Sequence, residues 1–174
     1  MLTDIFYRSL YYKMFNCEFS DFSFVSANGT SCTGKLRNIS PFFGTAGNYY
    51  PHIAKFHKDS SYGAGVVFGT GTTPPTISDR TWAGTNITTF TASVSVSSGE
   101  ENGKAYIEAL YTITNTGSEA FTIGEICTFA NCSASTNTNY SALMDRTVLE
   151  NPVAIPVGGI GQVTYRIYAD MMTS

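Results

Sequence analysis

The sequence has little charge. Charged residues make up 13% of its 174 residues, whereas a typical soluble domain has about 25%. The ten Lys and Arg residues are scattered, and the net charge is −3. A nucleic-acid interface needs a basic patch or stripe, so we expect no nucleic-acid partner.

Long apolar runs are also missing. No run reaches the ~18 residues that a membrane-spanning helix needs, so no membrane partner is expected. Asp4, Arg8 and Lys13 interrupt the first fifteen residues, and the pattern of a secretory signal is not met.

Catalytic motifs are absent as well. There is no G-x-S-x-G elbow, no P-loop and no G-x-G-x-x-G fingerprint. The sequence has two histidines, His52 and His57, which would lie on opposite faces of a strand. The charges of Glu100 and Glu101 fall in a predicted turn, where carboxylates are normally solvated. We therefore predict that the protein is not an enzyme, with no catalytic residue and no cofactor.

Cysteine is sparse, with four residues: Cys17, Cys32, Cys127 and Cys132. The favoured interpretation is free, mostly buried thiols in a reducing cell. A local bridge between Cys127 and Cys132 stays open as an alternative. Zinc sites need closely spaced ligand pairs, which the second pair fits loosely and the first does not, so no metal is predicted.

What the sequence does contain is alternation with a period of two. In residues 104–115, one face would carry Ala105, Ile107, Ala109, Tyr111 and Ile113. Residues 89–97 alternate in the same way, and the Asn-Gly pair at 102–103 is typical of a tight hairpin turn between the two. Such alternation is what half-buried antiparallel strands need.

Residues 65–76 are predicted to pair a short buried strand with a stiff, extended exit, and further strands are predicted at 120–130, 142–149, 151–157 and from 162 onward. Residues 115–119 are interpreted as the turn of a second hairpin. Several short strands at this spacing favour an all-β fold, an antiparallel β-sandwich that is immunoglobulin-like or jelly-roll-like, over residues 65–174.

Residues 1–64 are predicted to form a separate N-terminal region, a helical or extended arm followed by an irregular aromatic and glycine-rich segment. Residues 2–14 have helical spacing, and this helix would pack either on its own domain or on a neighbouring subunit. Phe22 and Phe24 alternate with polar residues and predict a strand before the Asn-Gly turn at 28–29. The candidate interface residues are Ile5, Phe6, Leu10, Phe42, Phe43, Tyr49 and Tyr50.

One charged pair, Asp145 and Arg146, interrupts an apolar stretch at 142–156. The favoured interpretation is a local salt bridge that fixes the entry of the strand. The alternative is an edge that contacts a partner.

Three motifs together carry a resemblance: residues 69–75 (GTGTTPP), residues 111–120 (YTITNTGSEA), and residues 143–159 (LMDRTVLENPVAIPVGG) followed by QVTYRI at 162–167. Residues 65–169 resemble the small β-sandwich structural proteins of tailed bacteriophages and prophages. The second and third motifs are also similar to bacterial immunoglobulin-like modules. No catalytic residue carries over from the resemblance.

The resemblance implies a virion structural protein: a capsid decoration protein, head–tail adaptor or tail-associated subunit. It would act by assembly with other virion proteins, most simply as a homo-oligomer, and would be assembled in the host cytoplasm. The rival interpretation is a carbohydrate- or host-receptor-binding sandwich, in which Trp82, Tyr49 and Tyr50 would stack on sugar rings.

Overall fold

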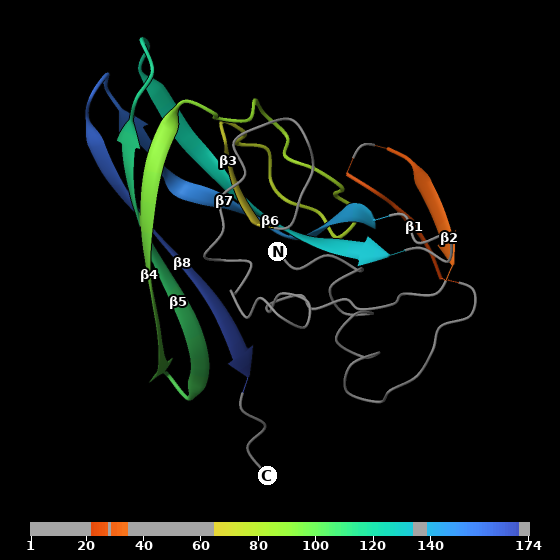
Figure 1. Cartoon of the computed structure of the whole chain (residues 1–174). Helices are drawn as coiled ribbons and strands as arrows, with labels where there is room; N and C mark the ends of the chain where they lie inside the picture. The colour runs from red at the N-terminus through yellow and green to blue at the C-terminus, as the bar shows by residue number, and fades with distance from the viewer. Residues whose placement is uncertain (1–21, 28, 35–64, 134–138, 171–174) are drawn as a thin grey trace. The chain divides into compact units, whose positions relative to one another are not determined.

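The computed structural model describes residues 22–27, 29–34, 65–133 and 139–170. All regular structure in these residues is β, and none of them is helical (Figure 1). The predicted all-β class with antiparallel sheets is therefore confirmed for this part of the chain. The helix predicted at 2–14 lies outside the described residues.

The first described strands form a short hairpin. Strand β1 (Phe22–Val25) pairs antiparallel with β2 (Ser31–Gly34). Gly29 has φ of 83°, a value that favours glycine because it has no Cβ. Ser26 donates its backbone N–H to the Thr30 carbonyl at 3.0 Å, and its Oγ accepts from Thr30 N at 3.1 Å. The predicted strand is present, and Gly29 lies between it and β2 as the predicted turn requires, whereas Asn28 lies outside the described residues.

A three-stranded sheet has the order β3-β6-β7. Strand β3 (Gly65–Gly69) is buried along its whole length and pairs antiparallel with β6 (Phe121–Ser133). Strand β7 (Asn139–Ile155) is one strand, whereas the sequence predicted two, 142–149 and 151–157. Pro152 lies within this strand, and an edge strand tolerates proline because its outer N–H needs no partner.

A second three-stranded sheet has the order β4-β5-β8. Strand β4 (Phe90–Glu101) pairs antiparallel with β5 (Lys104–Asn115), which also pairs with β8 (Ile160–Asp170). The hairpin turn has φ of 53° at Asn102 and 73° at Gly103, the left-handed pair that a two-residue type I′ turn requires. This hairpin was predicted from the sequence and is confirmed.

One prediction about connectivity is wrong. Residues 115–119 do not close a hairpin, because the neighbours of β5 are β4 and β8, and β6 belongs to the other sheet. Buried Asn115 holds this turn instead. Its Nδ2 donates to the carbonyls of Glu119 and Ile155, and its Oδ1 accepts from Gly117 N at 2.8 Å.

The described residues divide into two compact units. The first unit consists of the described residues up to Thr88 and of Ile123–Pro152. The second unit consists of Thr89–Thr122 and of the described residues from Val153 onward. Residues 65–170, predicted as one domain, thus contribute to both units. The predicted boundary at residue 64 lies outside the described residues and stays a prediction.

Candidate functional site: a buried ion cluster

The described residues of the first unit gather three charged side chains. Glu125 lies on β6, Arg146 lies on β7, and Asp79 comes from the loop between β3 and β4. The side chains of Glu125 and Arg146 are 0% and 2% exposed, and that of Asp79 is 21% exposed. Charges so deeply buried need partners, because desolvation of an unpaired ion costs several kcal/mol.

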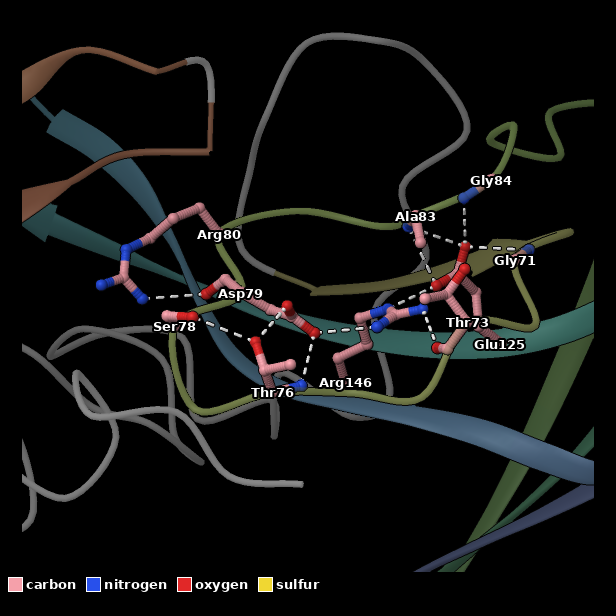
Figure 2. Close-up of polar contacts among 10 residues, drawn as sticks. All are labelled: Gly71, Thr73, Thr76, Ser78, Asp79, Arg80, Ala83, Gly84, Glu125 and Arg146. Atoms are coloured by element: carbon pink, nitrogen blue, oxygen red, sulfur yellow. Dashed lines mark hydrogen bonds and ion pairs between the residues drawn. The ribbon is translucent and has the colours of Figure 1, made fainter.

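The Glu125 carboxylate accepts hydrogen bonds from three backbone amides and one guanidinium. Its Oε1 accepts from Gly71 N at 3.0 Å and from Gly84 N at 2.9 Å. Ala83 N donates to both carboxylate oxygens at 3.1 Å. The Nε of Arg146 donates to Oε2 at 2.7 Å. Figure 2 shows the amides converging on this carboxylate from two separate stretches of the same loop.

Arg146 engages all three nitrogens of its guanidinium. Besides the bond to Glu125, its Nη1 donates to Asp79 Oδ2 at 2.8 Å, and its Nη2 donates to the Thr73 carbonyl at 2.7 Å. The planar fork of arginine suits this divergent arrangement, whereas the single ammonium of lysine does not.

Asp79 joins the cluster to its own loop. Its Oδ1 accepts from Thr76 Oγ1 at 2.7 Å, and its Oδ2 accepts from Thr76 N at 3.0 Å. The N–H of Asp79 in turn donates to the Thr76 carbonyl at 3.1 Å. These reciprocal bonds close a tight turn and hold the carboxylate where Arg146 reaches it (Figure 2).

Glycine makes the approach of the loop to Glu125 sterically feasible. A Cβ on Gly69 would lie 2.6 Å from Glu125 Oε1, and one on Gly71 would lie 2.6 Å from its carboxyl carbon. Real Cβ atoms do not come so close, so a side chain at either position would push the carboxylate away from its amide donors. Close packing against the Glu125 carboxylate thus explains why the 69–75 motif has glycine at positions 69 and 71.

The electrostatics of the cluster favour the charged forms. Burial alone would raise the pKa of Glu125, but hydrogen bonds from Gly84, Arg146 and Ala83 together hold it below its ordinary value. Burial also opposes ionisation of Asp79, but its bonds to Thr76 and Arg146 lower its pKa. The pKa of Arg146 is raised, because its two carboxylate partners outweigh its desolvation.

This arrangement can position a loop. Both carboxylates and all three guanidinium nitrogens have partners within the cluster. The described residues contain no group of three His, Cys, Asp or Glu placed to hold a metal ion. We interpret the cluster as a clasp that fixes residues 70–86 against β6 and β7.

The structure gives Arg146 partners that the sequence did not suggest. Arg146 has carboxylate partners far away in sequence, 67 and 21 residues distant. Asp145 accepts from Thr147 Oγ1 at 2.8 Å. Sequence reasoning found Arg146 but missed Glu125 and Asp79 as its partners. The usable signal was a charged residue in a strand that is otherwise apolar, because Glu125 lies between Ile123 and Ile126, both fully buried.

The other predicted residues have different outcomes. Ile5, Phe6, Leu10, Phe42, Phe43, Tyr49 and Tyr50 all lie outside the described residues. Trp82 is partly buried and packs edge-on against Phe129, with ring centroids 5.9 Å apart. Cys127 is a buried free thiol, and burial raises its pKa well above the ordinary value.

A second polar cluster lies on the exposed face of the β4-β5-β8 sheet. Arg166 lies 4.7 Å from the centre of the Tyr106 ring and donates to Glu108 Oε2 at 2.5 Å. Tyr168 donates its hydroxyl to Glu101 Oε2 at 2.8 Å, and its ring centroid is 5.8 Å from that of Tyr106. This second cluster joins all three strands of the sheet across one face.

None of the described residues belongs to a helix that is long and apolar enough to cross a membrane. Comparison with protein-family models, with curated proteins and with solved structures finds no match to this chain.

Proposed function

We propose that this protein is a structural subunit of a bacteriophage particle that acts by assembly with copies of itself and with other virion proteins. In this proposal the protein has a β-sandwich fold, immunoglobulin-like or jelly-roll-like. Capsid decoration, head–tail joining and tail association are all compatible roles.

The observation that carries the proposal is the exposed end of the β4-β5-β8 sheet. The buried side chains of β5, Ala109, Tyr111 and Ile113, lie on one face. The same face continues toward the hairpin tip with Val96 and Ile107, which are 43% and 36% exposed. They are diagonal neighbours across the β4–β5 ladder, close enough to form one apolar contact. In this proposal a partner subunit covers this apolar contact.

The buried ion cluster gives the same proposal a second line of support. Its charged groups hold a loop in place, and a rigid loop suits a subunit that must present a constant surface. The expected interfaces at the N-terminal arm and at residues 41–51 belong to the proposal as well.

Particles purified by density gradient from the organism that carries the gene test this function directly. Mass spectrometry should detect peptides of this protein in the particle band at a fixed ratio to the major capsid protein. Their absence from intact particles, while the protein is present in the cell lysate, would contradict the virion role.

A second candidate, a glycan-binding sandwich, is favoured by one observation: Tyr106 and Tyr168 lie together beside Arg166, Glu108 and Glu101 on an open sheet face. Aromatic rings flanked by polar groups suit sugar recognition. A glycan array with Tyr168→Ala as the comparison tests it. Trp82, named for this role from the sequence, is instead engaged with Phe129.

A further inference from the structure

The outer edge of β4 is a long strand edge that no other described strand pairs. Among the described residues, β4 has a neighbour on one side only, β5. Its twelve residues pair with β5 in a continuous register from Phe90↔Asn115 to Glu101↔Lys104, so no bulge interrupts it. Its sequence, FTASVSVSSGEE, has no proline and no lysine. Natural sheets usually carry one of these devices on an exposed edge to prevent pairing with another chain.

The register shows which backbone groups face outward. Thr116 N donates to the Thr89 carbonyl, which makes 89 and 116 a hydrogen-bonded pair at the start of the β4–β5 ladder. Because such pairs alternate along an antiparallel ladder, the odd-numbered residues of β4 bond to β5. The even-numbered ones therefore direct N–H and C=O away from the sheet: Ala92, Val94, Val96, Ser98 and Glu100.

We propose that β4 pairs antiparallel with β4 of a second copy of this chain, joining two β4-β5-β8 sheets into one continuous six-stranded sheet. The inference deepens the proposed assembly function and rests on it, but it does not depend on the virion role.

The charges of β4 favour a second copy in the antiparallel orientation. Glu100 and Glu101 are the charged residues of the strand, and both lie at one end. Antiparallel pairing about the middle of β4 places the two acidic ends at opposite ends of the new ladder, whereas parallel pairing would set them side by side. Like charges opposite one another destabilise a sheet.

The exposed apolar side chains fit the same arrangement. If the twofold axis passes near Val96, the sheet face that carries Val94 and Val96 in one copy is continuous with the same face of the other copy. Val96, 43% exposed in the single chain, would then contact its counterpart or Val94 across the axis. The interface is isologous, as a twofold symmetric dimer requires.

The other edge of the same sheet is less suitable. Strand β8 carries Arg166 and Asp170, and Arg166 is already engaged with Glu108 and Glu101. In addition, Tyr168 bonds to Glu101 across the sheet. The choice between the two edges can therefore be tested with matched variants.

The test uses the full chain and two proline variants. Val96→Pro removes one outward N–H from β4, and Thr164→Pro removes one from β8. Asn115 N bonds to the Gly159 carbonyl, so by the same alternation the backbone N–H and C=O groups of the even-numbered β8 residues face away from β5. Edge strands accept proline at such positions. Circular dichroism establishes that both variants are folded, and light scattering after size exclusion measures their mass.

The expected result is a dimer, or a multiple of it, for the wild type and Thr164→Pro, and at least a tenfold weaker self-association for Val96→Pro. A parallel readout needs no variant. Amide exchange at Val94, Val96 and Ser98 should slow as protein concentration rises, while exchange at Ser93, Ser95 and Ser97, already bonded to β5, should not change.

Three outcomes would overturn the β4 pairing: a monomeric wild type, an oligomer that Val96→Pro leaves unchanged, or an oligomer that Thr164→Pro alone dissociates. The second and third leave the assembly function intact and move the interface elsewhere. A protein that is monomeric and also absent from purified particles would remove both the pairing and the proposed function.

Discussion

Replacing Arg146 with methionine is the strongest test of the clasp. Methionine keeps much of the aliphatic volume and removes the charge, which leaves Glu125 ionised and 0% exposed without its cationic partner. Breaking a buried ion pair by removing one partner costs about 3–5 kcal/mol. Since small domains are stable by only about 5–15 kcal/mol, Arg146→Met should lose a large share of the free energy of unfolding.

The measurement is urea unfolding followed by circular dichroism at pH 7, with thermal unfolding beside it. At this chain length about 1 kcal/mol corresponds to a shift of roughly 2–4 °C, so the midpoint should fall by roughly 6–20 °C. If Arg146→Met does not fold, Arg146→Lys keeps the charge but loses the fork that reaches three acceptors, and it should be clearly destabilised as well.

The chain offers a matched control in Arg166→Met. Arg166 also contacts two carboxylates, Glu108 at 2.5 Å and Glu101 at 3.3 Å, but its side chain is 34% exposed. Exposed ion pairs contribute little because water and salt screen them, so this variant should move the midpoint far less. Equal effects of the two substitutions would refute the argument that burial makes the clasp important.

A double variant separates the ion pair from general packing. In Glu125→Gln with Arg146→Met, the Gln carbonyl still accepts from the loop amides, and position 125 no longer carries a buried charge without its partner. The double variant should be less destabilised than the sum of the two single variants, because contacting residues are not additive. Strict additivity would show that the two side chains act independently.

Three further predictions concern the loop, the crossing turn and pH. Gly71→Ala should destabilise the protein by displacing Glu125 from its amide donors, with the exposed neighbour Thr72→Ala as control, both measured by urea unfolding; equal stability would contradict the close approach. Asn115→Asp keeps the acceptor for Gly117 N but replaces the donor to two carbonyls, and should cost about 1–3 kcal/mol; an unchanged midpoint would contradict the role of the amide. The folded pKa values of Glu125 and Asp79 lie below their ordinary 4.5 and 3.8, so the stability that these carboxylates contribute is fully present above about pH 4.5 and is lost as the pH falls through the lower folded values. Glu125→Gln should therefore flatten the dependence of the unfolding free energy on pH between pH 5 and pH 2. An unchanged dependence would rule out the Glu125 carboxylate as its source.

Local patterns in the sequence predicted most of the strands. Strand β5 occupies residues 104–115 as predicted, because one half-buried face imposes a period of two that survives in the sequence. The Asn-Gly turn at 102–103 was equally predictable, since few other residues adopt left-handed backbone at both central positions. The single strand β7 was harder to predict, because the local pattern suggested two shorter strands, 142–149 and 151–157, and the length of a strand also depends on the sheet that it joins, which is a non-local property.

Sheet membership could not be read from the local pattern. Residues 115–119 look like a hairpin turn, with Asn, Gly and Ser between two apolar strands, yet β6 pairs with β3 and β7. What distinguishes the crossing turn is buried Asn115, whose amide bonds to a carbonyl 40 residues away. An asparagine is typical both of a hairpin turn and of a turn that connects two different sheets, so the residue type alone does not tell them apart.

The ion cluster shows why a site made of distant residues is the hardest part to predict. Arg146 stood out because it interrupts an apolar stretch, and the nearest acid, Asp145, was the natural candidate for its partner. On an extended strand, however, neighbouring side chains point to opposite faces, so a residue next to Arg146 in sequence is not the only place to look for its counter-charge. Its counter-charge can also come from the adjacent strand or from a loop that covers the sheet, as Glu125 and Asp79 do. The same reasoning applied in advance would have called for a buried acid elsewhere as well, and Glu125, between two buried isoleucines, is the acid that best meets that requirement.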